Sequence, residues 1–175
     1  ENKKTMLKKQ DKYNIAIVGA TGIVGESLLS ILDSRSFPIN SIHAVASQKS
    51  KGVKVKFGDH LLTVEALDEF DFSNIDIAFF SAGGSISKEY APKAASQGCI
   101  VIDNTSEFRY VDNIPLIVPE VNPNDIDKYK ETNIIANPNC STVQMLVALK
   151  PLHDEFGVDN INVSTYQAVS GSGKD

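Results

Sequence analysis

The chain contains 175 residues, of which 42% are hydrophobic and 22% are charged, a composition typical of a soluble globular protein with one full domain and part of another. Its formal net charge is −5, but the lysine-rich first 12 residues carry +3, which leaves −8 for the rest and makes a poor surface for nucleic acid. No apolar run approaches the roughly 20 residues that span a bilayer, so we expect neither a nucleic-acid nor a membrane partner.

Residues 1–12 are predicted to form a flexible basic tail, because no apolar core or cleavage pattern of a signal peptide follows them. The two cysteines, Cys99 and Cys140, lie in unrelated segments, which indicates a reducing, cytoplasmic environment rather than a disulfide framework. The three histidines are scattered and form no ligand cluster, so no metal site is predicted.

The first predicted element is an apolar strand at residues 13–18, which leads into the turn Gly-Ala-Thr-Gly-Ile-Val-Gly and then into leucines and isoleucines at helical spacing. Glycines at a strand-to-helix turn let a pyrophosphate approach the backbone and the helix N-terminus, so this turn is predicted to bind a dinucleotide. Ala20 occupies a glycine place of the usual fingerprint, and a strand-to-helix turn without a ligand is the alternative. The predicted cofactor contacts are Gly19, Ala20, Thr21, Gly22, Ile23, Val24 and Gly25.

A second strand is predicted at residues 41–47, whose end in an NAD-binding fold carries an acidic residue for the ribose 2′-hydroxyl. No acidic residue lies between Asp33 and Asp59, and the sequence Gln-Lys-Ser-Lys-Gly follows the strand instead. Cations and hydroxyl groups suit a 2′-phosphate, so NADP is the predicted cofactor. The alternative is an exposed lysine loop before a β-hairpin that is predicted at 53–57 and 61–65. The contacts predicted in this loop are Ser47, Lys49 and Ser50.

Two further strands, at residues 76–80 and 99–103, flank a helix predicted at 88–97 with Gly98 as its C-cap. The first of these strands ends in small residues, where a parallel strand meets a ligand crevice. The second carries Cys99, which is predicted to lie in the core. The cofactor contacts predicted after the first strand are Ser81, Ala82 and Gly83.

The loop at residues 104–110 is polar and carries Arg109. The planar guanidinium group of arginine suits a phosphate or a carboxylate, and the alternative is a solvated surface side chain. Downstream, a strand is predicted at 133–136.

That strand ends in the hexapeptide Asn-Pro-Asn-Cys-Ser-Thr. Asn139 is a strong N-cap, and the following apolar stripe predicts a helix at 141–156 that bends at Pro151 and ends at Gly157. Cys140 would then lie where the helix dipole and backbone N–H groups stabilise a thiolate, which is a good carbonyl nucleophile. A small buried structural cysteine is the alternative that the hexapeptide leaves open.

A final strand is predicted at residues 161–168 and carries Gln167. Strands and helices alternate along most of the chain, which predicts an α/β fold with a Rossmann-like, doubly wound and mostly parallel sheet. The predicted NADP-binding domain covers residues 13–139. Residues 140–175 are predicted to begin an incomplete α+β catalytic or dimerisation domain.

Together the motifs resemble those of the aspartate-semialdehyde dehydrogenases over about residues 13–175. The resemblance implies an NADP-dependent oxidoreductase that reversibly reduces aspartyl phosphate to aspartate semialdehyde through a cysteine thioester and releases phosphate. It also implies a place in lysine, threonine, methionine and diaminopimelate biosynthesis, and a homodimer or homotetramer. The segments that carry the resemblance are 19–25, 81–85, 101–109, 118–122, 137–142 and 164–173.

The resemblance also implies roles for single residues. Cys140 would be the nucleophile, and Gln167 would help to orient the substrate. Arg109 and Asn139 would contact phosphate or the reacting acyl group. The further cofactor contacts implied are Ser170 and Gly171.

Two departures from the family pattern are visible. Lys49 stands where the family often has an arginine for the NADP phosphate. The family's histidine acid/base, its substrate-carboxylate arginine and a further phosphate-binding lysine all lie beyond Asp175, so the 175-residue chain alone is expected to be inactive. Two alternatives stay open: an enzyme like N-acetyl-glutamyl-phosphate reductase, and an inactive nucleotide-binding or dimerisation fragment.

Overall fold

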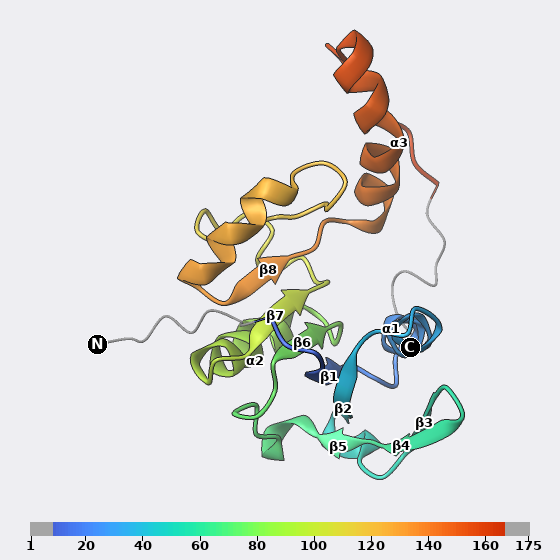
Figure 1. The fold of residues 1–175 in the computed structure, drawn as a ribbon, viewed down its shortest axis with the longest axis vertical. Helices are drawn as coiled ribbons and strands as arrows, with labels where there is room; N and C mark the ends of the chain where they lie inside the picture. The colour runs from blue at the N-terminus through green and yellow to red at the C-terminus, as the bar shows by residue number, and fades with distance from the viewer. Residues whose placement is uncertain (1–8, 167–175) are drawn as a thin grey trace.

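The computed structural model describes residues 9–166, and within them six strands form one parallel sheet. The strand order is β5-β2-β1-β6-β7-β8 (Figure 1). The chain builds one half of the sheet outward from β1 and then returns to build the other half, which is the arrangement of a doubly wound fold. The strands are β1 Tyr13–Val18, β2 Ile39–Ala46, β5 Glu65–Ala66, β6 Ile77–Phe80, β7 Ile100–Asp103 and β8 Ile134–Ala136.

Both faces of the sheet are buried by helices. In β1, Ile15 and Ile17 belong to the core cluster that includes residues of α1 (Ile23–Ser34), whereas the intervening Ala16 belongs to the cluster that includes residues of α2 (Gly84–Ser96). Successive side chains of a strand point to opposite faces, so a continuous apolar run marks a strand that is covered on both sides. The predicted Rossmann-like α/β fold is confirmed.

The predicted β-hairpin is present beside α1. Its strands are β3 (Lys54–Phe57) and β4 (His60–Thr63), and Val55 packs into the core cluster of α1. The second strand is shorter than predicted because Glu65 and Ala66 pair with β2 in the main sheet instead. Short 3₁₀ helices complete the loops: η1 Gln48–Ser50, η2 Leu67–Glu69 and η3 Pro123–Glu131.

Helix α2 begins four residues earlier than the predicted start at residue 88. Gly83, with φ of +97°, ends the preceding loop. The residues after it are weak helix formers, but they form the first turn of α2 because a buried hydrogen bond anchors this turn. Ser87 of that turn is completely buried and donates a hydrogen bond to Asp103. The helix ends at Ser96, with Gly98 in the left-handed region just beyond it, close to the predicted end.

Helix α3 (Cys140–Phe156) follows β8 and projects away from the sheet (Figure 1). Its predicted N-cap is confirmed, because the Asn139 side chain accepts a hydrogen bond of 3.0 Å from the Ser141 N–H. The helix continues through Pro151, and Gly157, with φ of +72°, ends it as predicted.

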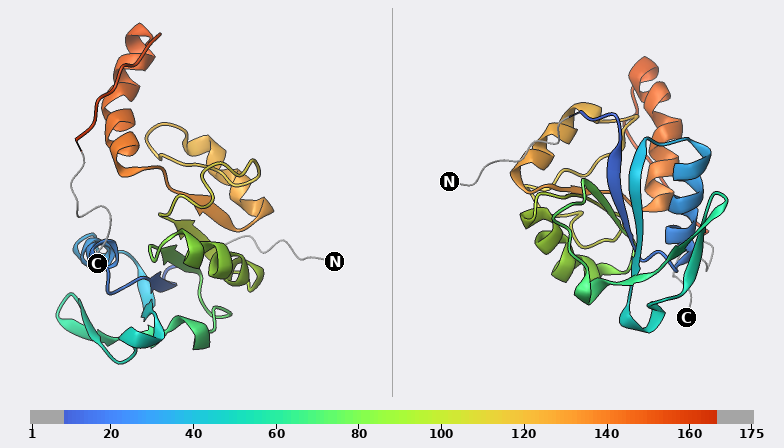
Figure 2. Two further views of the ribbon diagram at one scale, coloured as in Figure 1. Left: turned by 180° about the vertical axis from the view of Figure 1, so that it is seen from behind. Right: turned by 60° about the horizontal axis from the view of Figure 1, so that its bottom comes forward.

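The prediction of a strand at residues 161–168 is wrong for residues 161–166, the part that the structure describes. These residues carry no regular secondary structure. This segment runs back along α3 (Figure 2) and lines an apolar groove with Met145 and Leu149. A β-strand needs a neighbouring strand for its backbone hydrogen bonds, and within residues 9–166 the segment pairs with none. Residues 167 and 168 lie outside the described residues.

Candidate active site and cofactor pocket

The carboxyl ends of β1 and β6 meet at the point where the chain direction across the sheet reverses. Gly19 lies there with φ of +92°, and a Cβ atom at this position would lie 2.9 Å from the backbone carbon of Ser81. The Ser81 N–H donates a 2.9 Å hydrogen bond to the Val18 carbonyl, which holds the two loops together. Only glycine fits this backbone conformation and this close approach.

A second close backbone approach sets the start of α1 against the same loop. A Cβ atom at Gly25 would lie 2.2 Å from the Gly19 carbonyl oxygen, so a glycine is required for the helix to pack this close. The N-cap, Gly22, offers no side-chain capping hydrogen bond to the first turn of the helix. The N-terminus of α1 therefore suits a bound anion.

These loops surround a pocket of about 680 Å³, a size that accommodates a small organic cofactor. Nine of the predicted cofactor contacts line it, which supports the predicted location of the cofactor. They are Gly19, Thr21, Gly22, Ile23, Val24, Ser47, Ser81, Ala82 and Gly83.

Four other predicted contacts do not line this pocket. Ala20 is completely buried, and its N–H group donates to the Val45 carbonyl, while Gly25 is buried under the turn. Lys49 and Ser50 lie in η1, directly after the pocket residue Ser47. Other predicted contacts, Gln167, Ser170 and Gly171, lie outside the described residues.

The pocket also has lining residues that were not among the individually predicted cofactor contacts. The clearest are Asn104, Thr105 and Ser106, in the loop after β7. Their position was indicated by the general rule that ligands bind at the carboxyl ends of parallel strands. The remaining additional lining residues are Val18, Ala46, Leu67, Gly84 and Ile86.

A buried carboxylate fixes the loop after β7. Asp103 is completely buried and accepts hydrogen bonds of 2.6 Å from the Ser87 hydroxyl and 2.7 Å from the Thr105 hydroxyl. Thr105 in turn accepts a hydrogen bond from the Glu107 N–H. A buried carboxylate needs such donors, so the first turn of α2 and the pocket loop are held as one unit.

The loop predicted to bind the 2′-phosphate contains two lysines in different surroundings. The Nζ atom of Lys51 lies 2.5 Å from Oε2 of Glu69. Oε1 of Glu69 also accepts a 2.7 Å hydrogen bond from Nε2 of Gln48. The Lys51 hydrogen bond, followed by that from Gln48, lowers the pKa of the Glu69 carboxyl below its usual value. Among the described residues, no carboxylate forms an ion pair with Lys49, so this lysine is the better placed of the two to bind a phosphate.

The two cysteines have opposite environments, as the sequence predicts. Cys140 is exposed in the first turn of α3, whereas Cys99 is completely buried. Burial, followed by the charge of Asp76, raises the pKa of the Cys99 thiol to about 12, so Cys99 is a poor nucleophile at neutral pH. The alternative of a buried structural cysteine holds for Cys99 and not for Cys140.

Arg109 lies next to the cysteine turn, where it binds backbone carbonyl groups. Its Nε donates a 3.0 Å hydrogen bond to the Asn137 carbonyl, and its Nη2 donates a 3.1 Å hydrogen bond to the Asn104 carbonyl. The structure therefore brings Arg109 together with the loop that carries Asn139 and Cys140. These bonds use two of the five N–H donors of the guanidinium group.

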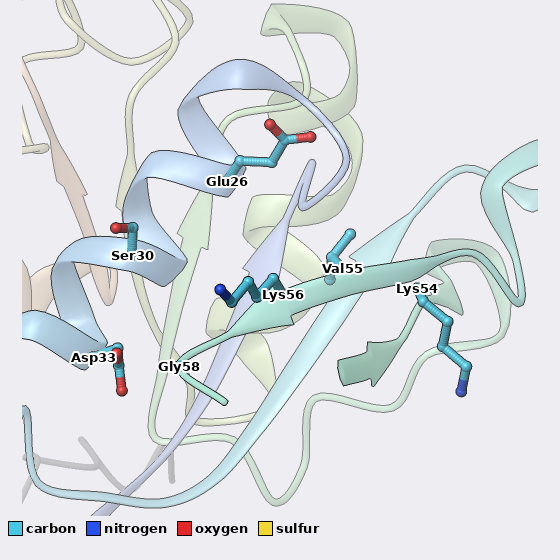
Figure 3. A pocket seen from close by; sticks show the side chains of 7 residues that line it. All are labelled: Glu26, Ser30, Asp33, Lys54, Val55, Lys56 and Gly58. Carbon is cyan, nitrogen blue, oxygen red and sulfur yellow. The ribbon is translucent and has the colours of Figure 1, made fainter. Parts of the chain in front are cut away.

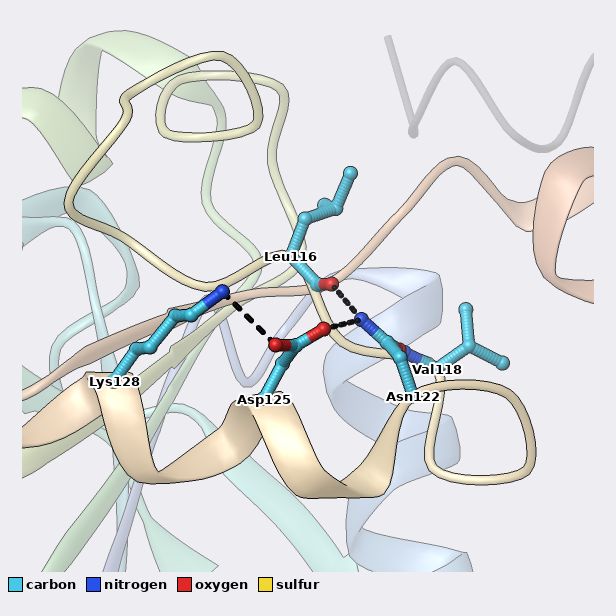
Figure 4. A network of polar contacts seen from close by, with 5 residues as sticks. All are labelled: Leu116, Val118, Asn122, Asp125 and Lys128. Atoms are coloured by element: carbon cyan, nitrogen blue, oxygen red, sulfur yellow. Dashed lines mark hydrogen bonds and ion pairs between the residues drawn. The ribbon is translucent and has the colours of Figure 1, made fainter.

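The Asn122 side chain ties together the segment before η3 (Figure 4). Its Oδ1 accepts from the Val118 N–H at 2.9 Å, and its Nδ2 donates to the Leu116 carbonyl and to Asp125. Lys128 pairs with Asp125 and, ahead of Asn122, lowers the pKa of that carboxyl. Leu116 forms a parallel bridge to Ala136, so this network supports the strand that leads to Cys140.

A smaller groove of about 420 Å³ lies between α1 and β3 (Figure 3). Lys56 reaches toward α1 there, whereas Lys54 points away from the helix. Glu26 and Asp33 place two carboxylates on the opposite wall, so the groove is less suited to a phosphate than the pocket at the glycine turn.

Neither a metal-binding cluster nor a membrane-spanning helix is found in the described part of the chain. Residues 9–166 contain no group of three or more histidine, cysteine, aspartate or glutamate residues that could hold a metal ion. No helix among them is long and apolar enough to cross a membrane.

A parallel sheet with a glycine turn, a helix N-terminus and a pocket at its switch point defines a dinucleotide-binding domain of the Rossmann type. Comparison with protein families then identifies the particular group. The family model for the NAD-binding domain of semialdehyde dehydrogenase matches residues 14–129, and the model for its dimerisation domain matches residues 149–175. The chain belongs to the semialdehyde dehydrogenase family, which confirms the resemblance seen in its motifs.

Individual relatives agree with this assignment. An aspartate-semialdehyde dehydrogenase of Legionella pneumophila is 58% identical over 161 residues, which are 92% of this chain and 46% of the relative. A crystal structure of aspartate semialdehyde dehydrogenase II from Vibrio cholerae, complexed with ASA, matches with a TM-score of 0.91 and 53% identity over 94% of this chain and 49% of that one. A Candida albicans aspartate semialdehyde dehydrogenase with NADP matches with a TM-score of 0.70 and 26% identity over 84% of this chain and 48% of that one. The chain spans about half the length of the curated relatives it matches.

Proposed function

We propose that this chain is the cofactor-binding and nucleophile-bearing part of an aspartate-semialdehyde dehydrogenase that uses NADP. The observation that carries the proposal is the position of Cys140, exposed at the start of a helix that follows β8, at the same carboxyl edge of the sheet as the nucleotide pocket. Relatives at 52–58% identity bear this enzyme name, which supports the substrate class.

The proposed reaction begins at the sulfur of Cys140. In the biosynthetic direction the thiolate attacks the acyl carbon of aspartyl phosphate, a C–S bond forms, and the phosphate leaves with the electrons of the acyl C–O bond. The first-turn N–H groups of α3 stabilise negative charge on the acyl oxygen. When bound, NADPH supplies a hydride to the acyl carbon; the C–S bond then breaks, which releases the aldehyde and regenerates the Cys140 thiolate. Arg109 and Asn139 are proposed to contact the phosphate or the acyl group.

The cofactor is proposed to lie in the pocket at the glycine turn. The close approach of Gly19 and Gly25, which leaves the backbone and the N-terminus of α1 open to the pocket, fits a pyrophosphate. Ser47, Lys49 and Ser50 are proposed to contact the 2′-phosphate, with Lys49 as the cation. Gln167, Ser170 and Gly171 stay predictions for the substrate and the cofactor.

The proposal includes the organisation of the whole enzyme. Residues 13–139 form the NADP-binding domain, and a catalytic and dimerisation domain begins at Cys140. The family match to a dimerisation domain at residues 149–175 supports a homodimer, which we place in the cytoplasm. The co-substrate of the oxidative direction is inorganic phosphate.

A chimera tests the function, in which residues 1–175 precede the second half of the Vibrio cholerae relative. We expect it to reduce NADP with aspartate semialdehyde, in a reaction that depends on phosphate. Cys140→Ala should abolish turnover without loss of NADP binding. A chimera that binds NADP but turns over only N-acetyl-glutamyl semialdehyde would contradict the proposed substrate. A fully active Cys140→Ala chimera would contradict the proposed nucleophile.

A further inference from the structure

A hydrogen-bonded pair of asparagines joins the nucleotide pocket to the turn that carries Cys140. Asn104 lines the pocket, and its Oδ1 accepts a 2.7 Å hydrogen bond from Nδ2 of Asn137, three residues before the cysteine. The two residues follow neighbouring strands, β7 and β8, and are 33 positions apart in the chain. Both are partly buried.

The backbones of the same two residues are already anchored. Asn104 N–H donates to the Phe80 carbonyl at 2.9 Å, and Asn137 N–H donates to the Asp103 carbonyl at 2.8 Å. Arg109 bonds to both of their carbonyl groups. The side-chain bond is therefore not needed to pair β7 with β8, and its removal should leave the sheet intact.

Among residues 9–166, no strand pairs with the segment that directly follows Asn137. Pro138 is buried and has no N–H group to donate, and Asn139 is exposed and is occupied as the N-cap of α3. The direction in which the chain leaves the sheet thus depends on how Asn137 is held. A shift of the order of 1 Å in a reacting group can cost about 100-fold in rate.

We propose that the Asn104–Asn137 side-chain pair positions Cys140 relative to the bound cofactor. Neither asparagine contacts the reacting atoms in this proposal, so both are positioning residues. The inference rests on the proposed function for the identity of the reaction, but the geometry concerns only the cysteine turn and the pocket.

Two substitutions of nearly equal shape and charge separate this role from a merely structural one. Asn137→Asp removes the donor and sets a carboxylate against the Asn104 oxygen, whereas Asn104→Asp keeps an acceptor for Asn137. Both add one negative charge near the turn. Asn40→Asp is a matched control, because Asn40 Nδ2 donates a 2.8 Å hydrogen bond to Asn14 Oδ1 at the opposite end of the strands.

The first measurement uses the 175-residue chain and the rate at which iodoacetamide alkylates Cys140, with the buried Cys99 as an internal reference. We expect Asn137→Asp to slow Cys140 alkylation at least about fivefold more than Asn104→Asp does, because fivefold corresponds to the loss of one neutral hydrogen bond and the bond kept in Asn104→Asp is made to a carboxylate. Asn40→Asp should match the parent chain. The unfolding midpoint of Asn137→Asp should equal that of Asn40→Asp.

The second measurement uses the chimera described above. Asn137→Asp is expected to lower kcat at least about tenfold with little change in KM for NADP. Asn104→Asp is expected to lose less kcat but to raise KM for NADP, because its added carboxylate lines the pocket.

Equal Cys140 alkylation rates in Asn104→Asp and Asn137→Asp would overturn the inference. It would also be overturned if Asn40→Asp slowed alkylation as much as Asn137→Asp does. If the parent chimera showed no dehydrogenase activity, the proposed function would fail, while the alkylation rates would still decide the role of the asparagine pair.

Discussion

Lys49 and Lys51 occupy the same 3₁₀ turn region but have different surroundings. Lys51 pairs with Glu69, whereas no ion pair to Lys49 occurs among residues 9–166. A charged hydrogen bond to a phosphate contributes about 1.5–3 kcal/mol. We therefore expect Lys49→Ala to weaken NADP binding about tenfold and NAD binding less than twofold, and Lys51→Ala to have a smaller effect.

Fluorescence titration of both cofactors against the two variants measures these affinities. Equal losses of NADP and NAD affinity in Lys49→Ala would show that the lysine does not read the 2′-phosphate.

Cys99 makes stability depend on pH in the alkaline range. Burial and the charge of Asp76 raise its pKa from 9.0 to about 12 in the folded chain. Below pH 9 the thiol is protonated in both states and has no effect on the pH dependence. Between pH 9 and 12 the unfolded chain releases this proton and the native chain retains it, so the native state loses about 1.4 kcal/mol per pH unit from this group.

Urea unfolding of the parent and of Cys99→Ala at pH 8 and pH 10 tests this expectation. Lysines and tyrosines titrate in both proteins, so the difference between the two pH dependences isolates the thiol. The variant is expected to be less stable at pH 8, because it leaves a small cavity, but to lose less stability on going to pH 10. Parallel losses would contradict the assignment.

Among the elements, α1 packs against the glycine turn with almost no free space between the two backbones. A Cβ atom at position 25 would lie 2.2 Å from the Gly19 oxygen and 2.7 Å from the Ala20 Cα, and both are backbone atoms. We expect Gly25→Ala to move α1 away from the turn. The expected cost is about 1–3 kcal/mol of stability, with at least a tenfold loss of NADP affinity.

Ser30→Ala is the matched control, because Ser30 is exposed on the same helix and should change stability by no more than about 0.5 kcal/mol. Thermal unfolding and NADP titration of both variants supply the comparison. Undiminished NADP binding by Gly25→Ala would mean that the helix start does not hold the pyrophosphate.

At the scale of the whole molecule, the end of α3 and the segment after it form an apolar surface in the described chain. Leu152 is 51% exposed, Phe156 is 79% exposed and Val163 is 55% exposed. Apolar surface of this kind marks an interaction site or an aggregation liability. This surface lies within residues 149–175, which match the family model of a dimerisation domain.

We expect the 175-residue chain to self-associate through this surface, and the double variant Leu152→Ser, Phe156→Ser to remain monomeric at higher concentration. Leu61→Ser is the control, because Leu61 is 67% exposed in the distant hairpin. Sedimentation velocity over a range of concentrations measures the change. A control that reduces association as much as the double variant would indicate nonspecific association.

Features that depend on neighbouring residues could be predicted from the sequence alone. A continuous apolar run identified β1 as a strand buried on both faces, and the glycine spacing identified the strand-to-helix turn. Asn139 before an apolar helical stripe identified the N-cap and placed Cys140 in the first turn. These features are local because capping, periodicity and glycine conformations act over a few residues.

Contacts between side chains of distant segments, in contrast, became apparent only in the folded chain. Lys51 pairs with Glu69 across 18 positions, and Asn137 with Asn104 across 33. Such pairs depend on the packing of strands and loops, which local patterns do not specify. The same limit explains the wrong strand at residues 161–166: its apolar alternation suits a strand, but a strand forms only where another one offers its backbone groups, and none in the described chain does so.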